Sequence, residues 1–217
     1  MAILEILPDT DPILRKTSRR VRHVDDKLRK IVADMYETMV KNWGVGLAAI
    51  QVGVAKRLFI YEIPKREMTG YETCPTPKEK SEGESEGSLS SEEAEEEGGY
   101  TGNYTVCINP RIISKEGSYI EEEGCLSKVG WVAKVERAIK VTFEAYDLEM
   151  KRFERTVEGL EARCVQHEID HLDGILFTDR AIPGTLREIT EEELEESESL
   201  QIDSAPSEEV EETVATE

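Results

Sequence analysis

The chain has 217 residues, a formal net charge of -20, and 34% charged against 38% hydrophobic residues. That length is sufficient for one domain with a sizeable core. No apolar run approaches the about 18 residues that a membrane span needs. The N-terminus has no basic segment followed by a long apolar stretch, so we expect no secretory signal. Four cysteines without an export signal indicate a reducing compartment, and we therefore expect a cytoplasmic protein.

The negative charge is concentrated in two segments. Residues 79–97 contain nine glutamates and one lysine, and residues 188–217 contain thirteen acidic residues and no lysine or arginine. These segments carry -8 and -13, which leaves about +1 for the rest of the chain. The body of the protein is thus near neutral and lacks the basic stripe of a nucleic-acid binder. We expect no direct nucleic-acid binding.

The composition predicts one folded domain with two acidic appendages. Residues 65–103 are rich in Glu, Ser, Gly and Pro and poor in apolar residues, which favours a disordered surface insertion. Residues 186–217 are interpreted as a mostly disordered tail, although residues 189–200 would also suit a short acidic helix. The folded domain is then predicted to comprise residues 1–185, interrupted by the insertion.

The predicted elements are two helices with four strands between them. An amphipathic helix is expected over residues 25–42, because Leu28, Ile31, Val32, Met35 and Met39 share one face. A second helix is expected from Leu160 to Leu172, where apolar residues recur at spacings of three and four between Gly159 and Gly174. Strands are predicted over residues 57–63, 104–109, 139–146 and 153–158, the last two forming a hairpin. The expected fold is α+β, with mixed or antiparallel strands packed around the second helix.

The second helix carries the most informative pattern in the chain. His167 and His171, two of only three histidines, stand at i and i+4, and Glu168 directly follows the first. On a helix both imidazoles lie on one face, one turn apart, where they can reach the same metal ion. Glu168 is offset to the side and can exchange a proton with a water at the metal without being a ligand. The alternative is a solvated acidic face. Asp170, on the opposite side, suits either the surface or a supporting contact.

A third ligand is required, and Cys125 is the preferred candidate. A Cys-His-His set can hold a divalent transition metal and leave a fourth position open for chemistry. Metallopeptidases with this histidine spacing use a downstream ligand instead, for which Glu191 and Glu192 are available. Of the other cysteines, Cys107 and Cys164 fit apolar core patterns, and Cys74 lies in the insertion.

A glycine-rich stretch, residues 44–53, follows the first helix. Its glycines and alanines allow a backbone to approach a ligand closely, and Gln51 offers an amide N–H donor. The alternative interpretation is a tight packing loop before the following strand.

Together these blocks resemble the peptide deformylase family, whose three ordered motifs stand here as Gly44–Gln51, Glu123–Ser127 and Gln166–Gly174. The opening Asp11–Arg15 is also similar, and the resemblance covers about residues 3–182. Two positions depart from it. Ile50 replaces a frequent proline, and Lys128–Val132 replaces a run with an apolar residue, a proline and an arginine, which changes the expected substrate-side wall.

The resemblance implies an enzyme that removes the formyl group from the N-terminal formylmethionine of newly synthesised proteins and releases formate. It implies one divalent metal, with Fe(II) favoured, although the donor set also suits Zn, Ni or Co. The implied roles are metal ligands (Cys125, His167, His171), general base and acid (Glu168), oxyanion donors (the Gln51 amide and the Leu126 N–H), substrate-backbone partner (Gly46) and methionine-pocket wall (Val45).

The expected partners are N-formylmethionyl nascent chains. A transient ribosome association stays open, because the C-terminus here is acidic and not the basic helix by which family members can dock. Two other functions remain as alternatives, a metallopeptidase and a catalytically inactive relative that acts as a binding protein. Turnover of a formyl-methionyl peptide against its unformylated counterpart separates all three.

Overall fold

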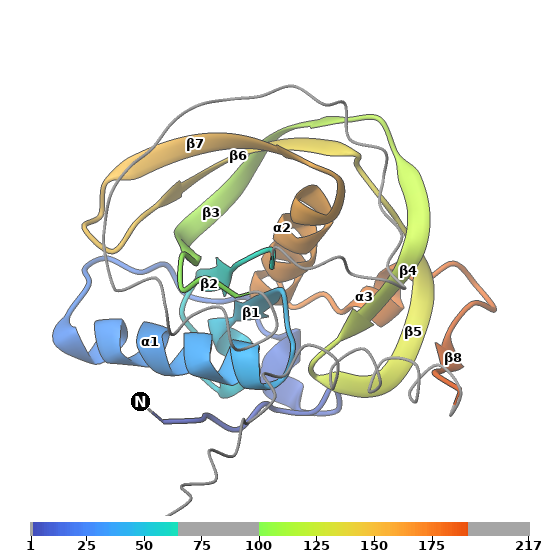
Figure 1. Cartoon of the computed structure of the whole chain (residues 1–217), viewed down its shortest axis with the longest axis horizontal. Helices are drawn as coiled ribbons and strands as arrows, with labels where there is room; N and C mark the ends of the chain where they lie inside the picture. The colour runs from blue at the N-terminus through green and yellow to red at the C-terminus, as the bar shows by residue number, and fades with distance from the viewer. Residues whose placement is uncertain (1, 65–99, 191–217) are drawn as a thin grey trace, which may run out of the picture.

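The computed structural model describes residues 2–64 and 100–190. Figure 1 shows α2 (Gly159–Leu172) at the centre of the molecule, with α1 (Asp26–Lys41) lying across one side. The remaining helical turns are η1 (Pro12–Arg15), η2 (Ala49–Val52) and α3 (Phe177–Arg180). The strands are β1 (Gly46–Ala48), β2 (Leu58–Tyr61), β3 (Thr105–Glu116), β4 (Tyr119–Cys125), β5 (Lys128–Arg137), β6 (Lys140–Tyr146), β7 (Arg152–Glu158) and β8 (Arg187–Glu188).

The strands form two antiparallel sheets on either side of α2. The larger has the order β1-β2-β3-β6-β7, and the smaller has the order β4-β5-β8. Figure 1 shows the β4–β5 hairpin as a long curved ribbon along one side of α2, with β8 at its outer edge. Because β1 is an edge strand of the larger sheet, one of its sides has no strand partner among the described residues. The predicted α+β class is confirmed.

Helix α1 is fixed at its start by a side-chain cap and along its length by an apolar face. The Asp25 carboxylate accepts a hydrogen bond of 2.8 Å from the N–H of Leu28, which satisfies one of the free donors of the first turn. Four of the five apolar residues of the predicted face are buried (Leu28, Val32, Met35 and Met39), Ile31 is partly buried, and the helix packs against β1 and β2. This packing sets the position of the loop that follows the helix and leads into the pocket described below.

Helix α2 is buried on nearly every side, in agreement with the prediction that strands pack around it, although its apolar period alone indicates only one buried face. Its polar residues lie inside the protein, where other polar groups meet them. The helix ends at Leu172, and the chain turns away at Gly174, whose φ of 78° is readily adopted only by glycine. A β-carbon there would also lie 2.7 Å from the backbone carbonyl of Arg15. The segment 15–18 therefore packs directly against the end of α2.

The predicted helices and the four predicted strands are confirmed with small shifts at their ends. Strand β3 runs to Glu116, beyond the predicted end, and β4 and β5 were not predicted as strands. Tyr100, predicted to lie in the disordered insertion, is described and buried. Strand β8 extends the fold past residue 185. Most of the two segments predicted to be disordered, residues 65–99 and 191–217, lies outside the described residues. The same holds for most of the acidic helix considered over residues 189–200.

No helix in the described part of the chain has both the length and the apolar character needed to cross a membrane.

Candidate metal centre

Three potential metal ligands from two elements converge beside α2. Cys125 ends β4, whereas His167 and His171 lie one turn apart on α2. The Cys125 Sγ lies 3.2 Å from His171 Nε2, and that nitrogen lies 3.1 Å from His167 Nε2. All three donor atoms lie within 4.8 Å of one another. The helical spacing thus produces the predicted pair of imidazoles, and the β4–β5 hairpin delivers the sulfur.

This spacing fits a single metal ion. Two imidazole nitrogens at about 2.0–2.1 Å from a tetrahedral metal lie roughly 3.3 Å apart, and a thiolate bonds at about 2.3 Å. The observed Nε2–Nε2 distance of 3.1 Å is close to that separation. Burial lowers the pKa of His171 well below its ordinary value, which favours the neutral imidazole that a metal requires. One thiolate and two imidazoles suit a divalent transition metal.

The sulfur of Cys125 is surrounded by N–H donors. The backbone N–H of Ser127 points at Sγ from 3.4 Å, and the Nε2 of Gln51 lies 3.6 Å from it. Gln51 is held in this orientation because its Oε1 accepts a hydrogen bond of 2.8 Å from the N–H of Ala48. The amide N–H group of Gln51 therefore faces the candidate metal centre.

Glu168 is a buried carboxyl group beside the three ligands. Burial raises its pKa to about 7, a value suited to a group that both accepts and donates a proton near neutral pH. A β-carbon on Gly46 would lie 2.7 Å from Glu168 Oε1, so the carboxylate contacts the backbone of β1 directly. Its second oxygen, Oε2, is buried without a hydrogen-bond partner among the described residues. A buried carboxyl oxygen of this kind suits a site where a substrate or water is bound.

A buried carboxylate orients one of the two imidazoles. Glu123 Oε1 lies 2.6 Å from His167 Nδ1, and this contact leaves Nε2 directed at Cys125 and His171. Glu123 is in turn held by Arg137, whose guanidinium makes bonds of 2.6 and 3.0 Å to its two oxygens. Such a carboxylate behind a metal-binding histidine fixes the orientation of the ring.

The charge network continues to the far side of α2. Arg137 also contacts Asp170, which is buried and ion-paired with Arg180. Asp170 was expected either at the surface or in a supporting contact. It is buried and makes the supporting contact. Because each buried charge has an oppositely charged neighbour, the network ties α2 to β4 and β5.

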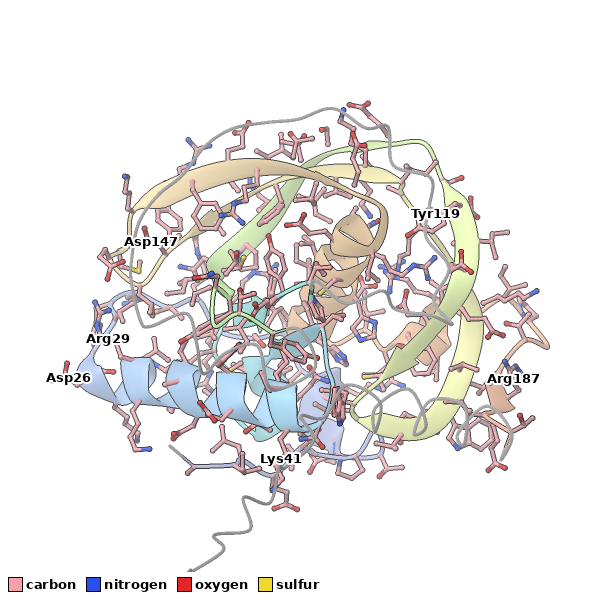
Figure 2. All side chains as sticks on the ribbon, viewed as in Figure 1. Asp26, Arg29, Lys41, Tyr119, Asp147 and Arg187 are labelled. Atoms are coloured by element: carbon pink, nitrogen blue, oxygen red, sulfur yellow. The ribbon has the colours of Figure 1, made fainter. Side chains whose placement is uncertain are left out.

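A pocket of about 490 Å³ opens beside these groups. One wall comes from the segment Gly44–Gly46, and another comes from residues 122–131 of the β4–β5 hairpin. The floor includes Leu160 and Cys164 of α2. Lys41, labelled at the end of α1 in Figure 2, contributes to the pocket rim. The edge strand β1 reaches this pocket at Gly46, and an edge strand can pair with an extended peptide.

The structure brings all the predicted site residues together. Those that line the pocket are Val45, Gly46, Gln51, Cys125, Leu126, His167 and Glu168, and His171 completes the three-ligand cluster. The rival third ligands at positions 191 and 192 lie outside the described residues. Sequence reasoning missed Glu123 and Arg137, and it interpreted Cys164 as core only. Glu123 stands within the second motif, but nothing in its local sequence indicates the distant arginine that stabilises it.

Comparison with known proteins identifies the family. The model of the polypeptide deformylase family matches residues 3–186. The chain belongs to the polypeptide deformylase family. Among its relatives, the peptide deformylase of Alkalilimnicola ehrlichii is 41% identical over 179 residues, which cover 82% of each protein. That of Thermomicrobium roseum is 36% identical over 200 residues, which cover 92% of this chain and 98% of the relative.

Solved deformylase structures agree with this assignment. A peptide deformylase from Legionella pneumophila matches with a TM-score of 0.66 and 36% identity, over 93% of this chain and 98% of that one. One from Ehrlichia chaffeensis in complex with actinonin matches with a TM-score of 0.66 and 33% identity, over 84% and 91% of the two chains. As a deformylase, this protein is a metal-dependent hydrolase that removes the N-formyl group from newly synthesised proteins.

Proposed function

We propose that the deformylase reaction of this chain takes place in the pocket beside α2. The proposed ligands of one divalent metal ion are Cys125, His167 and His171. The observation that carries the proposal is the convergence of these three donor atoms within 4.8 Å of one another, next to a buried carboxyl group and an edge strand. When bound, a divalent metal acts as a Lewis acid that polarises a carbonyl group and lowers the pKa of water.

Glu168 is the proposed general base and acid. Its carboxylate accepts the proton of the attacking water and later delivers a proton to the nitrogen of the departing amine. The burial that raises its pKa to about 7 supports this role, because one group can then serve in both directions near neutral pH. Proton transfer by a positioned side chain contributes about a hundredfold to ten-thousandfold in rate.

Two N–H donors are proposed to stabilise the formyl oxygen as it gains negative charge. One is the side-chain amide of Gln51, whose Nε2 lies 3.6 Å from the Cys125 Sγ and faces the site. The other is the backbone N–H of Leu126, the residue that follows this cysteine at the turn of the hairpin. Gln51 is neutral, so it can donate without competing as a ligand. Loss of one such donor typically costs about 3 kcal/mol of transition-state stabilisation.

The substrate is proposed to bind as an added strand along β1. The backbone of Gly46 would pair with the peptide, because β1 is an edge strand that borders the pocket. Val45, together with Leu160 and Cys164, would surround the methionine side chain with mostly apolar groups. A glycine at position 46 is needed because Glu168 lies too close for any larger residue.

We propose Fe(II) as the native metal and the cytoplasm as the location. Thiolate and imidazole ligands bind iron, nickel, cobalt and zinc alike, and the family resemblance favours iron. We also propose a transient contact with the ribosome, since the formylated N-terminus of the substrate emerges there. Metal analysis of protein purified without oxygen tests the first point, and co-sedimentation with ribosomes tests the last. Zinc in place of iron would contradict the metal assignment.

The decisive assay compares formyl-Met-Ala-Ser with its unformylated counterpart. We expect the metal-loaded protein to release formate from the first peptide and to leave the peptide bonds of both intact. Cleavage of a peptide bond would favour the metallopeptidase. Binding of the formylated peptide without formate release would favour an inactive binding protein.

A further inference from the structure

The pocket segment Gly44–Gly46 is held from behind at two consecutive carbonyl groups. The carbonyl oxygen of Gly44 accepts a buried hydrogen bond of 2.9 Å from the hydroxyl group of Tyr100. The carbonyl oxygen of Val45 accepts one of 3.1 Å from the backbone N–H of Glu62. Both partners come from outside the glycine-rich motif. The position of the segment therefore depends on residues that the motif does not include.

These two partners lie on the two sides of the acidic segment 65–99 in the sequence. They are also joined to each other, because the backbone N–H and the hydroxyl group of Thr101 both donate to Glu62 Oε1, at 2.6 and 2.7 Å. The other oxygen of Glu62 accepts a bond of 2.8 Å from Tyr36 of α1. Glu62, just after β2, and the residues Tyr100 and Thr101 thus belong to one hydrogen-bonded cluster behind the pocket wall.

Tyr100 is itself well fixed. Only 3% of its surface is exposed, and it belongs to the apolar cluster that contains Met39 and Leu47. Its ring cannot move far, so the hydroxyl group sets where the Gly44 carbonyl lies. Without that hydroxyl, a buried carbonyl would lose its partner, which is costly enough to favour a shift of the backbone.

A shift at Gly44 would affect both walls of the pocket. The Gly44 Cα is so close to the hairpin that an added β-carbon would lie 2.7 Å from the Cδ1 of Leu126. On its other side, Gly44 continues into Val45 and Gly46, which border the space for the substrate. The carbonyl that Tyr100 holds is therefore two residues before Gly46, the proposed backbone partner of the substrate, and it belongs to the residue that packs against Leu126.

We propose that Tyr100 is a positioning residue for substrate binding, which acts through the Gly44 carbonyl and not through contact with the substrate. The inference rests on the proposed placement of the peptide along β1, with Gly46 as its backbone partner. It assigns a role in substrate affinity to Tyr100, the first described residue after the acidic segment, which no motif of the sequence indicates.

The test is Tyr100→Phe, which removes the hydroxyl group and keeps the ring. We expect the KM for formyl-Met-Ala-Ser and the Kd of the product Met-Ala-Ser to rise about three- to tenfold. The value of kcat should change less than twofold, and metal content should not change, because Tyr100 touches no proposed ligand. Both peptide constants are measured on the metal-loaded full chain.

The matched control is Tyr61→Phe. Tyr61 is also 3% exposed, and its hydroxyl group lies 2.7 Å from Glu161, away from the pocket. Loss of the Tyr61 hydroxyl group should lower the Tm about as much as Tyr100→Phe does. It should leave the KM and the Kd near the wild-type values. Thr101→Val removes the hydroxyl bond to Glu62 and keeps the backbone one. It provides a second route to the same segment and should raise KM in the same direction by a smaller factor.

The outcomes separate this inference from the proposed function. Wild-type protein that releases no formate would overturn the placement of the reaction and the inference with it. Active wild-type protein with KM and Kd in Tyr100→Phe within twofold of normal would overturn the inference alone. An equal rise in KM in Tyr61→Phe would also overturn it, because the effect would then be one of general stability. If Tyr100→Phe is too unstable to assay, an unchanged KM in Thr101→Val decides against the inference.

Discussion

Replacing Gly46 by alanine adds one methyl group between the substrate strand and the proposed general base. The new β-carbon would lie 2.7 Å from Cys164 Sγ, 2.7 Å from Glu168 Oε1 and 3.0 Å from Glu168 Cδ. Ordinary contacts between such atoms are about 3.5–4.0 Å, so these groups must retreat by roughly 1 Å. Both belong to the buried helix α2, which leaves little room for that movement.

A misplacement of about 1 Å at a reacting group can cost up to about a hundredfold in rate. We therefore predict that Gly46→Ala lowers kcat by about ten- to a hundredfold and stability by about 1–3 kcal/mol, the usual range for overpacking. Bound metal should stay near one equivalent, because the added methyl group touches none of the three proposed ligands. Steady-state kinetics, metal analysis and urea unfolding measure the three quantities.

The double variant Gly46→Ala/Cys164→Ala provides an internal control. Removal of the sulfur opens space on one side, so the backbone can shift away from Glu168 and part of the lost kcat should return. A kcat of Gly46→Ala within twofold of the wild-type value would refute the reasoning, since the close approach of β1 to the carboxylate would then have no catalytic consequence.

Two predictions concern the buried charge network. Glu123→Gln should weaken metal binding by about ten- to a hundredfold in chelator competition, because His167 loses its charged partner; an affinity equal to that of Glu121→Gln, on the same strand, would contradict this. Arg137→Met should lower the free energy of unfolding by about 3–5 kcal/mol, since two buried carboxylates lose their shared cation. The pair of Arg187 with Glu122 is only partly buried, which makes Arg187→Met the control, with a loss below about 1 kcal/mol. If the two arginine variants lost similar amounts of unfolding free energy, burial of the network would add nothing to stability.

Much of the candidate site was predictable because local geometry fixes it. The i and i+4 spacing of His167 and His171 places both rings on one face of any helix, wherever that helix lies. The helix itself was predicted from its apolar period. What the spacing does not reveal is that the opposite face is buried as well. Asp170 lies inside because Arg137 and Arg180 meet it there, and both arginines come from other elements.

The hairpin that carries Cys125 shows where local reasoning ends. Strand β4 contains three consecutive glutamates, so it has no alternation of apolar and polar residues, and strand prediction depends on that alternation. Glu123 is buried because distant residues pair with it, among them Arg137, fourteen residues away, and His167 on α2. Tertiary contacts of this kind override composition. They also explain why Tyr100, predicted to lie in the insertion, is ordered and buried: its hydroxyl group bonds to a carbonyl 56 residues earlier in the chain.

The measurement that tests the central claim most directly is the turnover of formyl-Met-Ala-Ser by Glu168→Gln at full metal occupancy. The glutamine keeps the shape and the hydrogen bonds of the side chain but cannot accept a proton. If Glu168 is the general base, the variant should retain one equivalent of metal while kcat falls by at least about a hundredfold. More than a tenth of wild-type turnover in the fully metal-loaded variant would contradict the account, because the proton would then be transferred by another group.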